Sequence, residues 1–293
     1  IVSDITKVLL CKLMIEKNKT VNIDDMDIKQ ILGMLKETYP VAFEQFDDFA
    51  LTEDDLKNVM ALLSNISLSD APSHIIGDAF QAIIGPTIRG DKGQFFTPKS
   101  LVKCMIKIID PKDGEIIMDP ACGTGGFLVE SYGYQYNGKQ SETNSYYIGI
   151  DKDKDMSDLS MAVTEIITSG KSKVYNQNSL EILCEGCKNH DLLGTIDVIL
   201  TNPPFGSKIG VTEKTILEKY EFGHAWTFSE KDNTWYKMSN IVKSQDPQVL
   251  FIELCINLLK DGGRMAIVLP EGVFGNKSQG YIWAYLKEHG NIV

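Results

Sequence analysis

The feature that most constrains the fold is a regular alternation of short apolar runs with amphipathic segments after residue 115. Short apolar runs bounded by Gly, Pro, Asp or Asn are typical of buried strands, and segments with helical spacing of apolar residues separate them. The predicted strands cover Glu115–Met118, Tyr146–Ile150, Lys173–Asn176, Ile196–Thr201 and Gly263–Leu269. This alternation predicts an α/β fold with a doubly wound, mostly parallel, Rossmann-like sheet.

The first 90 residues show a different pattern, with four apolar stripes at helical spacing. The stripes lie within residues 5–14, 28–35, 56–63 and 75–83. Thr52, with Asp55 three residues later, is a helix-start signal before the third stripe. We expect the stripes to form a core, and we recognise no catalytic constellation among them. We therefore predict an α-helical N-terminal domain over residues 1–90, which is either an interaction domain or a wall of the site, and a second domain over residues 91–293.

A polar and aromatic tetrapeptide, Asn202-Pro203-Pro204-Phe205, comes directly after the predicted strand that ends at Thr201. In open α/β sheets, ligands bind beyond the carboxyl ends of the strands. The two prolines stiffen this loop, Asn202 and Pro203 offer acceptor oxygens, and Phe205 offers a flat apolar face. This combination fits a planar group that carries an exocyclic NH2. The alternative is a loop that merely ends a strand, because Asn and Pro are common turn residues.

A glycine-rich turn follows the first predicted strand. It reads Asp119-Pro120-Ala121-Cys122-Gly123-Thr124-Gly125-Gly126-Phe127. The spacing is neither that of a Walker phosphate loop nor that of the dinucleotide motif Gly-x-Gly-x-x-Gly. Glycines let the backbone turn tightly and approach a ligand closely. We predict that a ligand is bound here by Asp119, Ala121, Gly123, Thr124, Gly125, Gly126 and Phe127.

Two polar positions at the ends of the next strands extend this predicted site. Asp151 ends the second strand, where an acid can accept hydrogen bonds from both ribose hydroxyls. The alternative for Asp151 is an acidic residue at a helix start. Asn178, which is followed by Ser179, comes after the third strand, and its amide could read the edge of a base.

Gln94-Phe95-Phe96-Thr97-Pro98 precedes a helix that is predicted to run through Ile109. Thr97 suits the N-cap of that helix and Pro98 its first position. The two rings either staple onto the helix or form a lid over a ligand. A long polar insertion over residues 206–247, with Trp226, Trp235 and Tyr236, is predicted to be a substrate-side loop or cover, or to pack on the helical domain.

The composition bounds the partners and the compartment. The net charge is −11, and an acidic chain is a poor stand-alone binder of nucleic acid because phosphate contacts supply most of the affinity. Six cysteines favour a reducing cytoplasm, and Cys184 and Cys187 with His190 are too few ligands for a structural zinc, so we expect no metal. No apolar run is long enough to cross a bilayer. The sequence begins at Ile1 and stops at Val293, where a strand is expected to start, so we expect a piece of a longer protein.

Residues 94–98, 119–127 and 202–205, in this order, strongly resemble the motifs of the modification (M) subunit of type I restriction-modification systems. The resemblance covers residues 75–293 closely and the N-terminal helices loosely. That family methylates adenine N6 in DNA with S-adenosylmethionine. The resemblance therefore implies a methyltransferase domain, S-adenosylmethionine as cofactor and DNA as substrate. It also implies two partners, a separate specificity (S) subunit that reads the DNA sequence and a restriction (R) subunit.

The resemblance also implies roles for the motif residues. It places Phe96, Thr97, the glycine turn and Asp151 around the cofactor, and Asn202 and Phe205 at the target base. We extend these two sets to the neighbouring residues Gln94, Phe95, Pro98, Asn178 and Ser179 for the cofactor and Pro203 and Pro204 for catalysis. The sheet of the family has two further strands after the fifth, and this sequence ends where the first of them is expected to begin.

The residue types favour a direct methyl transfer. Acceptors from Asn202 and Pro203 would draw on the N–H bonds of an adenine amino group while Phe205 stacks on the extruded base. The sequence has no Pro-Cys dipeptide, so a cysteine attack on cytosine is disfavoured and Cys122 is expected to pack. The alternatives are a single-chain restriction-modification enzyme, a methyltransferase of protein glutamine amides, and a catalytically silent scaffold or DNA-recognition subunit. The glycine spacing disfavours a nicotinamide dehydrogenase.

Overall fold

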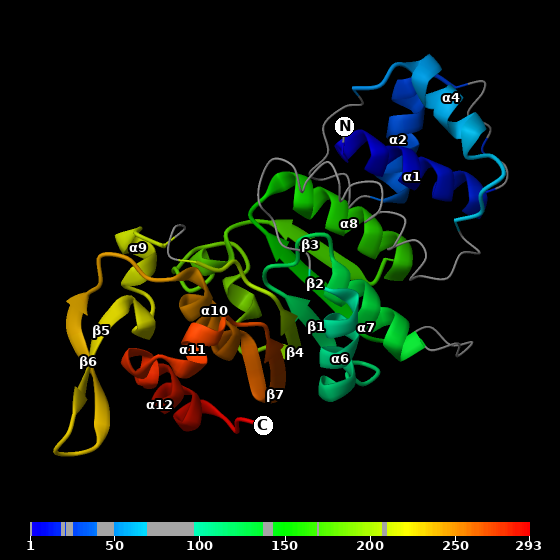
Figure 1. Cartoon of the computed structure of the whole chain (residues 1–293). Coiled ribbons are helices and arrows are strands. Elements are labelled where there is room, and N and C mark those ends of the chain that lie inside the picture. Colours follow the sequence, from blue (N-terminus) through cyan, green and yellow to red (C-terminus); the bar gives the residue numbers. More distant parts are fainter. Residues whose placement is uncertain are drawn as a thin grey trace. The chain divides into compact units, whose positions relative to one another are not determined.

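The computed structural model describes residues 2–18, 21, 26–39, 50–68, 97–136, 143–168, 170–206 and 210–293. The chain divides into two compact units, Ile1–Gln177 and Asn178–Val293. The predicted boundary near residue 90 falls among residues outside the described ranges and stays a prediction. Figure 1 shows the helices and strands of both units by label.

Among its described residues, the first unit begins with three helices that bear out the apolar stripes. They are α1 (Val2–Lys17), α2 (Ile28–Thr38) and α4 (Glu53–Leu62), and α1 contacts both others. Leu13, Leu35 and Leu56 from the three stripes are buried because they lie on the faces that pack. The capping box of Thr52 and Asp55 is confirmed: the Thr52 side chain accepts from the Asp55 N–H. The fourth stripe, over residues 75–83, lies outside the described residues.

The parallel strands of the first unit are β1 (Ile116–Asp119), β2 (Tyr146–Asp151) and β3 (Ser172–Asn176), in the order β3-β2-β1. Their register pairs Asp119 with Gly149 and Asp151 with Asn176. The helices of this part are α6 (Lys99–Ile109), α7 (Gly126–Tyr136) and α8 (Lys154–Thr168). Helices α7 and α8 contact each other and β2, so they lie on one face of the strands, as Figure 1 shows. Helix α1 packs on α8.

In the second unit, β4 (Ile196–Thr201) pairs in parallel with β7 (Leu259–Ile267). Every residue of β4 is buried, which fits its largely apolar and β-branched sequence, in which Asp197 is the one charged residue. Helix α10 (Pro247–Leu258) joins the hairpin region to β7 and is apolar almost all round, so ten of its residues are buried. The unit ends with α11 (Glu271–Gly275) and α12 (Gly280–His289). Parallel strands with flanking helices confirm the predicted α/β class.

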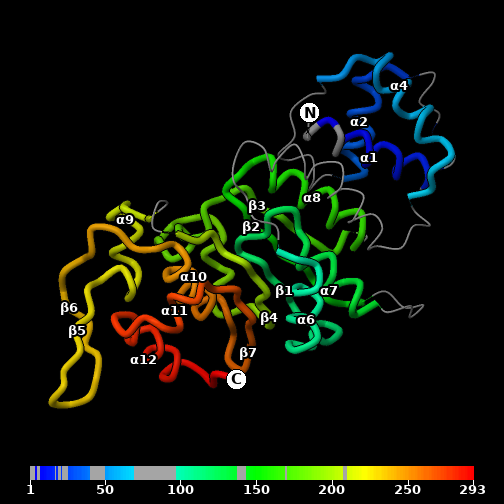
Figure 2. The backbone as a smooth tube through the Cα atoms, in the orientation of Figure 1, coloured from blue at the N-terminus to red at the C-terminus, as the bar shows by residue number. Residues whose placement is uncertain are grey.

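The insertion that was predicted to be a substrate-side loop or cover, or to pack on the helical domain, has secondary structure of its own. Short helices, α9 (Lys214–Leu217) and the 3-10 turn η5 (Glu221–Gly223), lead into an antiparallel hairpin of β5 (His224–Ser229) and β6 (Thr234–Ile241). The tube in Figure 2 follows the chain out along β5 and back along β6. Trp226 stacks on Tyr281 of α12 with ring centroids 5.5 Å apart, and Trp235 meets the same ring edge-on. Trp226 and Trp235 therefore pack one face of the hairpin against α12 within the second unit.

Several predicted boundaries were wrong by a few residues. The first strand is shifted by one residue and the third is longer by one residue, whereas the fifth begins at Leu259, four residues before the predicted start, and ends at Ile267, two residues before the predicted end. Residues 290–293 form no strand, although one was expected to start at Ile292. Helix α6 begins at Lys99, and Pro98 is the N-cap without a side-chain cap, because Pro98 has the extended ψ of 133°. Thr97 is therefore not the cap. In the described part of the chain, no helix is long and apolar enough to span a membrane.

Candidate active site

The glycine turn between β1 and α7 is built by the buried carboxylate that ends β1. Asp119 is 1% exposed, and its Oδ1 accepts from the N–H of Ala121 at 3.0 Å. Gly123 has φ +50° and Gly125 has φ +80°, a region that residues with a Cβ rarely adopt. A Cβ on Gly125 would stand 2.7 Å from Oγ of Ser160 in α8, whereas a Cβ on Gly123 would meet nothing within 4 Å. The turn is thus packed against α8 at Gly125 and open at Gly123.

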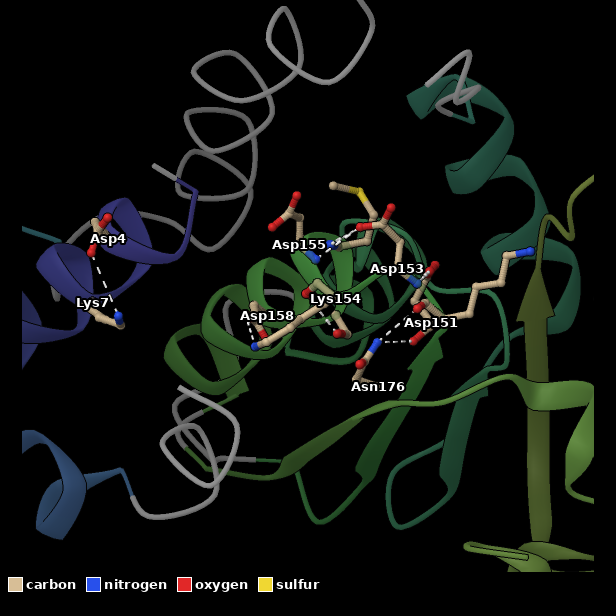
Figure 3. A network of polar contacts seen from close by, with 11 residues as sticks. Asp4, Lys7, Asp151, Asp153, Lys154, Asp155, Asp158 and Asn176 are labelled. Carbon is tan, nitrogen blue, oxygen red and sulfur yellow. Dashed lines mark hydrogen bonds and ion pairs between the residues drawn. The ribbon is translucent and has the colours of Figure 1, made fainter. Parts of the chain in front are cut away.

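Asp151, at the end of β2, is tied to this turn. Its Oδ2 accepts from the N–H of Gly123 at 2.9 Å, and its Oδ1 accepts from the N–H of Asp153 at 2.9 Å. Asp153 in turn begins α8, because its Oδ1 accepts from the N–H groups of Asp155 and Met156 at 3.0 and 3.3 Å. Figure 3 shows these carboxylates side by side at the start of the helix. The helix-start role that we weighed for Asp151 thus belongs to Asp153, and Asp151 holds the glycine turn.

Burial sets the electrostatics of this cluster. Desolvation raises the pKa of Asp151, and the hydrogen bonds from Asp153 and Gly123 oppose that rise. The pKa of the Cys122 thiol is raised well above its ordinary value, chiefly by burial and further by the nearby charges of Asp151 and Asp119. A thiol held in its neutral form is a poor nucleophile. Cys122 is buried beside β2, where a Cβ added to Gly149 would stand 3.0 Å from the Cys122 Sγ.

The hydrogen-bond acceptors and the negative charge of the turn fit an adenosyl cofactor with a sulfonium group. A ribose diol needs hydrogen-bond acceptors, and each Asp151 oxygen that takes one N–H can accept a further bond. The charges of Asp151 and Asp119 both raise the pKa of Cys122, so negative charge is concentrated at the turn. This charge favours a cationic ligand. The open side of Gly123 leaves its backbone accessible for close approach.

The other predicted cofactor residues are only partly described. Gln94, Phe95 and Phe96 lie outside the described residues, while Thr97 is half-buried and Pro98 is exposed before α6. Thr124 and Phe127 are buried, and Phe127 packs in the first turn of α7. In the second unit, Asn178 caps the 3-10 turn η2 (Ser179–Glu181) through its Oδ1, which accepts from Leu180 N–H at 3.3 Å. Its predicted reading of a base edge stays untested, as do the ligand contacts of the whole set.

The Asn202–Phe205 tip stands where β4 ends. Thr201 is the last residue of β4, and its carbonyl accepts from Val268 N–H at 3.0 Å. Asn202 is half-buried with its Oδ1 shielded from solvent, Pro203 is buried, and the Phe205 ring is 37% exposed. The loop turns away at Gly206, which has φ +114° and whose N–H donates to Oε1 of Gln248 in α10 at 3.4 Å. The tip therefore offers a shielded acceptor and an open aromatic face.

The cysteine pair and a cavity in the second unit supply no further residue to this candidate site. Cys184 and Cys187 are free, partly exposed thiols in a turn where Cys187 N–H donates to the Cys184 carbonyl at 3.2 Å. Across the described ranges, no group of three or more His, Cys, Asp or Glu residues could hold a metal ion. A cavity of about 460 Å³ in the second unit is lined by Trp226, Glu253 and Tyr285 among others, and by no residue of the Asn202–Phe205 tip.

Three residues with contacts at these positions were missed from the sequence. Asp153 and Asn176 both bind the Asp151 segment, and Gln248 binds the end of the tip. Asp153 could have been found, because an Asp one turn before an apolar stripe is a cap signal. Asn176 ends a predicted strand, and Gln248 lies 42 residues from Gly206, so neither carried a local signal.

The comparisons with known proteins cover most of the chain. Over 289 residues the chain is 29% identical to the methylase subunit of the type I restriction enzyme EcoEI from Escherichia coli, covering 94% of this chain and 52% of that protein. The chain thus spans about half the length of that relative.

Two solved structures show the same fold. The type I restriction-modification methyltransferase subunit from Streptococcus thermophilus matches with a TM-score of 0.64 at 21% identity, covering 97% of this chain and 59% of that one. A protein from Listeria monocytogenes assigned to the class I S-adenosylmethionine-dependent methyltransferases matches with a TM-score of 0.63 at 17% identity, covering 99% and 80%. The fold is therefore that of S-adenosylmethionine-dependent methyltransferases.

A family model described as N-6 DNA methylase matches residues 71–292, which is more than half of the chain and includes the glycine turn, Asp151 and the Asn202–Phe205 tip. The chain belongs to the N-6 DNA methylase family.

Proposed function

We propose that this chain transfers a methyl group from S-adenosylmethionine to N6 of adenine in double-stranded DNA, as the M subunit of a type I restriction-modification system. The observation that carries the proposal is the Asn202–Phe205 tip. In a member of the N-6 DNA methylase family, it offers a shielded amide oxygen and an exposed ring at the carboxyl end of a buried parallel strand.

The chemistry of the tip suits a flat amine. The amino nitrogen of adenine is a poor nucleophile because its lone pair is delocalised into the ring. Oδ1 of Asn202 and the carbonyl of Pro203 would accept its two N–H bonds and favour a tetrahedral nitrogen whose lone pair can attack. A hydrogen bond to a shielded oxygen is strengthened by the low local dielectric. The gain comes from positioning and preoriented dipoles, so no general base with a shifted pKa is needed before attack.

Phe205 supplies the surface for the base. An amino group inside a stacked duplex is out of reach, so enzymes that modify bases extrude the nucleotide into a pocket. With 37% of its side chain exposed, the Phe205 ring is available for stacking on the extruded base. Stacking on an aromatic ring contributes about 1–3 kcal/mol per base, which helps to offset the cost of unstacking.

The cofactor is proposed to bind at the glycine turn. S-adenosylmethionine supplies an electrophilic methyl group on a sulfonium. Asp151 would accept the ribose hydroxyls, the charges of Asp119 and Asp151 would favour the cation, and the backbone at Gly123 would lie against the ligand. Gln94 to Pro98, Asn178 and Ser179 remain proposed members of this site.

The charge of the chain supports a division of labour. With a net charge of −11, the chain is poorly suited to hold duplex DNA alone. We therefore propose that a specificity subunit supplies sequence recognition and much of the grip on DNA, and that a restriction subunit is a further partner. We also propose a cytoplasmic location, because the proposed substrate is cellular DNA.

The test replaces Asn202 by Ala. Tritium transfer from labelled S-adenosylmethionine to duplex DNA, measured with the specificity subunit present, should fall by about 10²–10³-fold, as when one preoriented hydrogen-bonding group is lost from an active site. Affinity for S-adenosylhomocysteine should stay unchanged. Asn240→Ala, at an exposed position of β6, is the matched control and should keep full transfer.

Full transfer by the Asn202→Ala protein would reject the assigned role of the tip. A wild-type protein that labels a protein acceptor in place of DNA would redirect the proposal to glutamine amides. A wild-type protein without turnover in the presence of its specificity subunit would favour a silent scaffold.

A further inference from the structure

The turn that carries Asp151 is clamped from the neighbouring strand by an asparagine side chain. Nδ2 of Asn176, the last residue of β3, donates to the carbonyls of Asp151 and Lys152, both at 3.1 Å. Gln177 N–H donates to the same Asp151 carbonyl at 3.0 Å. Figure 3 shows Asn176 directed at the Asp151 segment. These bonds extend the β2–β3 ladder, whose last register pair is Asp151 with Asn176, past the end of β2.

The carboxylate of Asp151 is held from two other directions. The glycine turn reaches Oδ2 through Gly123 N–H, and the start of α8 reaches Oδ1 through Asp153 N–H. All of these donors except Asn176 Nδ2 are backbone groups. Asn176 is therefore the member of this set whose contribution a substitution can remove without altering a backbone donor.

The side-chain amide nitrogen of Asn176 has two hydrogens, which serve the two carbonyl acceptors at 3.1 Å. These bonds hold the backbone of residues 151 and 152 in place, and that backbone in turn holds the Asp151 carboxylate. If the turn relaxed, the bonds from Gly123 and Asp153 would no longer hold both carboxylate oxygens in one orientation. A bidentate acceptor for a diol depends on that orientation, since hydrogen bonds weaken steeply when misaligned.

We propose that Asn176 is a positioning residue for the ribose of the cofactor: by clamping the carbonyls of Asp151 and Lys152, it fixes the Asp151 carboxylate in the orientation that accepts the ribose hydroxyls. This inference rests on the proposed function, because it takes an adenosyl cofactor as the ligand of the glycine turn.

The experiment compares two probes on the full chain by isothermal titration calorimetry. S-adenosylhomocysteine carries the ribose diol, and its 2′,3′-dideoxy form lacks it. Asn176→Ala should weaken binding of S-adenosylhomocysteine by about three- to tenfold, the loss expected for one or two net hydrogen bonds. It should leave the affinity for the dideoxy form unchanged, because that probe makes no use of Asp151.

Two further variants sharpen the result. Asn176→Ser keeps one donor and should fall between wild type and Asn176→Ala, which tests the clamp even where the alanine variant folds poorly. Asn144→Ala is the matched control, since Asn144 is also exposed, stands just before β2 and donates from Nδ2 to Asp113 at 3.3 Å. It should leave both affinities unchanged.

The outcomes separate this inference from the proposed function. Equal weakening of both probes by Asn176→Ala, or no weakening of either, overturns the positioning role while leaving the cofactor assignment intact. Failure of the wild-type chain to bind S-adenosylhomocysteine overturns the proposed cofactor, and the role of Asn176 falls with it.

Discussion

Replacing Glu253 by Gln should change how the stability of the protein depends on pH. Glu253 lies in the buried helix α10 and is only 2% exposed. Its carboxylate accepts from two backbone groups at the base of the hairpin, Glu221 N–H at 2.7 Å and Phe222 N–H at 2.9 Å. Burial raises the pKa of Glu253 from 4.5 to about 7, although these two bonds and the charge of Lys237 act to lower it. The neighbouring charge of Glu221 adds to the rise.

The sign and size of the pH effect on stability follow from this shift in the pKa of Glu253. Between pH 4.5 and about pH 7 the folded chain keeps the proton on Glu253, whereas the unfolded chain has released it. The contribution of Glu253 to stability is therefore fully present below pH 4.5 and is lost as the pH rises to about 7. At 1.36 kcal/mol for each pKa unit, the loss comes to about 3 kcal/mol.

Urea unfolding of wild type and Glu253→Gln at pH 5, 6, 7 and 8 measures this contribution. The free energy of unfolding of wild type minus that of the variant should fall by about 2.5 kcal/mol from pH 5 to pH 8, because Gln does not titrate and part of the contribution is already lost at pH 5. Asn240→Ala, at an exposed position of β6, changes no titratable group and is the control, so its difference from wild type should not vary with pH. A difference that stays constant within about 0.5 kcal/mol, or that rises with pH, would refute the reasoning.

Two further substitutions test packing and capping. A Cβ on Gly223 would stand 1.9 Å from the carbonyl oxygen of Leu217, so Gly223→Ala should lower the free energy of unfolding by about 3 kcal/mol, measured in urea. Gly272→Ala, where a Cβ meets nothing within 4 Å, should change it by less than about 0.5 kcal/mol, and equal effects would contradict the clash. Thr52→Ala removes the acceptor for Asp55 N–H at the start of α4 and should cost about 1 kcal/mol, whereas Thr52→Ser should recover most of it. Identical melting of the two Thr52 variants would show that the cap contributes nothing.

Much of the fold follows from local patterns in the sequence. The helix at residues 53–62 was predicted from its stripe and from Thr52 with Asp55, because a capping box uses atoms only three residues apart. The buried strand before Asn202 was predicted with the residues that it has, since a largely apolar and β-branched run with Gly194 before it and two prolines after it has few other solutions. The glycine turn was placed correctly, because only glycine adopts φ +50° and +80° readily.

The tertiary structure decided what depends on distant partners. The insertion over residues 206–247 lacks a strong period, and it forms a hairpin because Trp226 and Trp235 find Tyr281 in a helix that follows more than 40 residues later. The raised pKa of Glu253 and the clamp of Asn176 on Asp151 likewise have no signal in their neighbours. Periodicity and turn chemistry are set by atoms within a few residues, so the sequence alone can specify them. Desolvation and long-range hydrogen bonds depend on which segments meet, and only the folded chain brings those segments together.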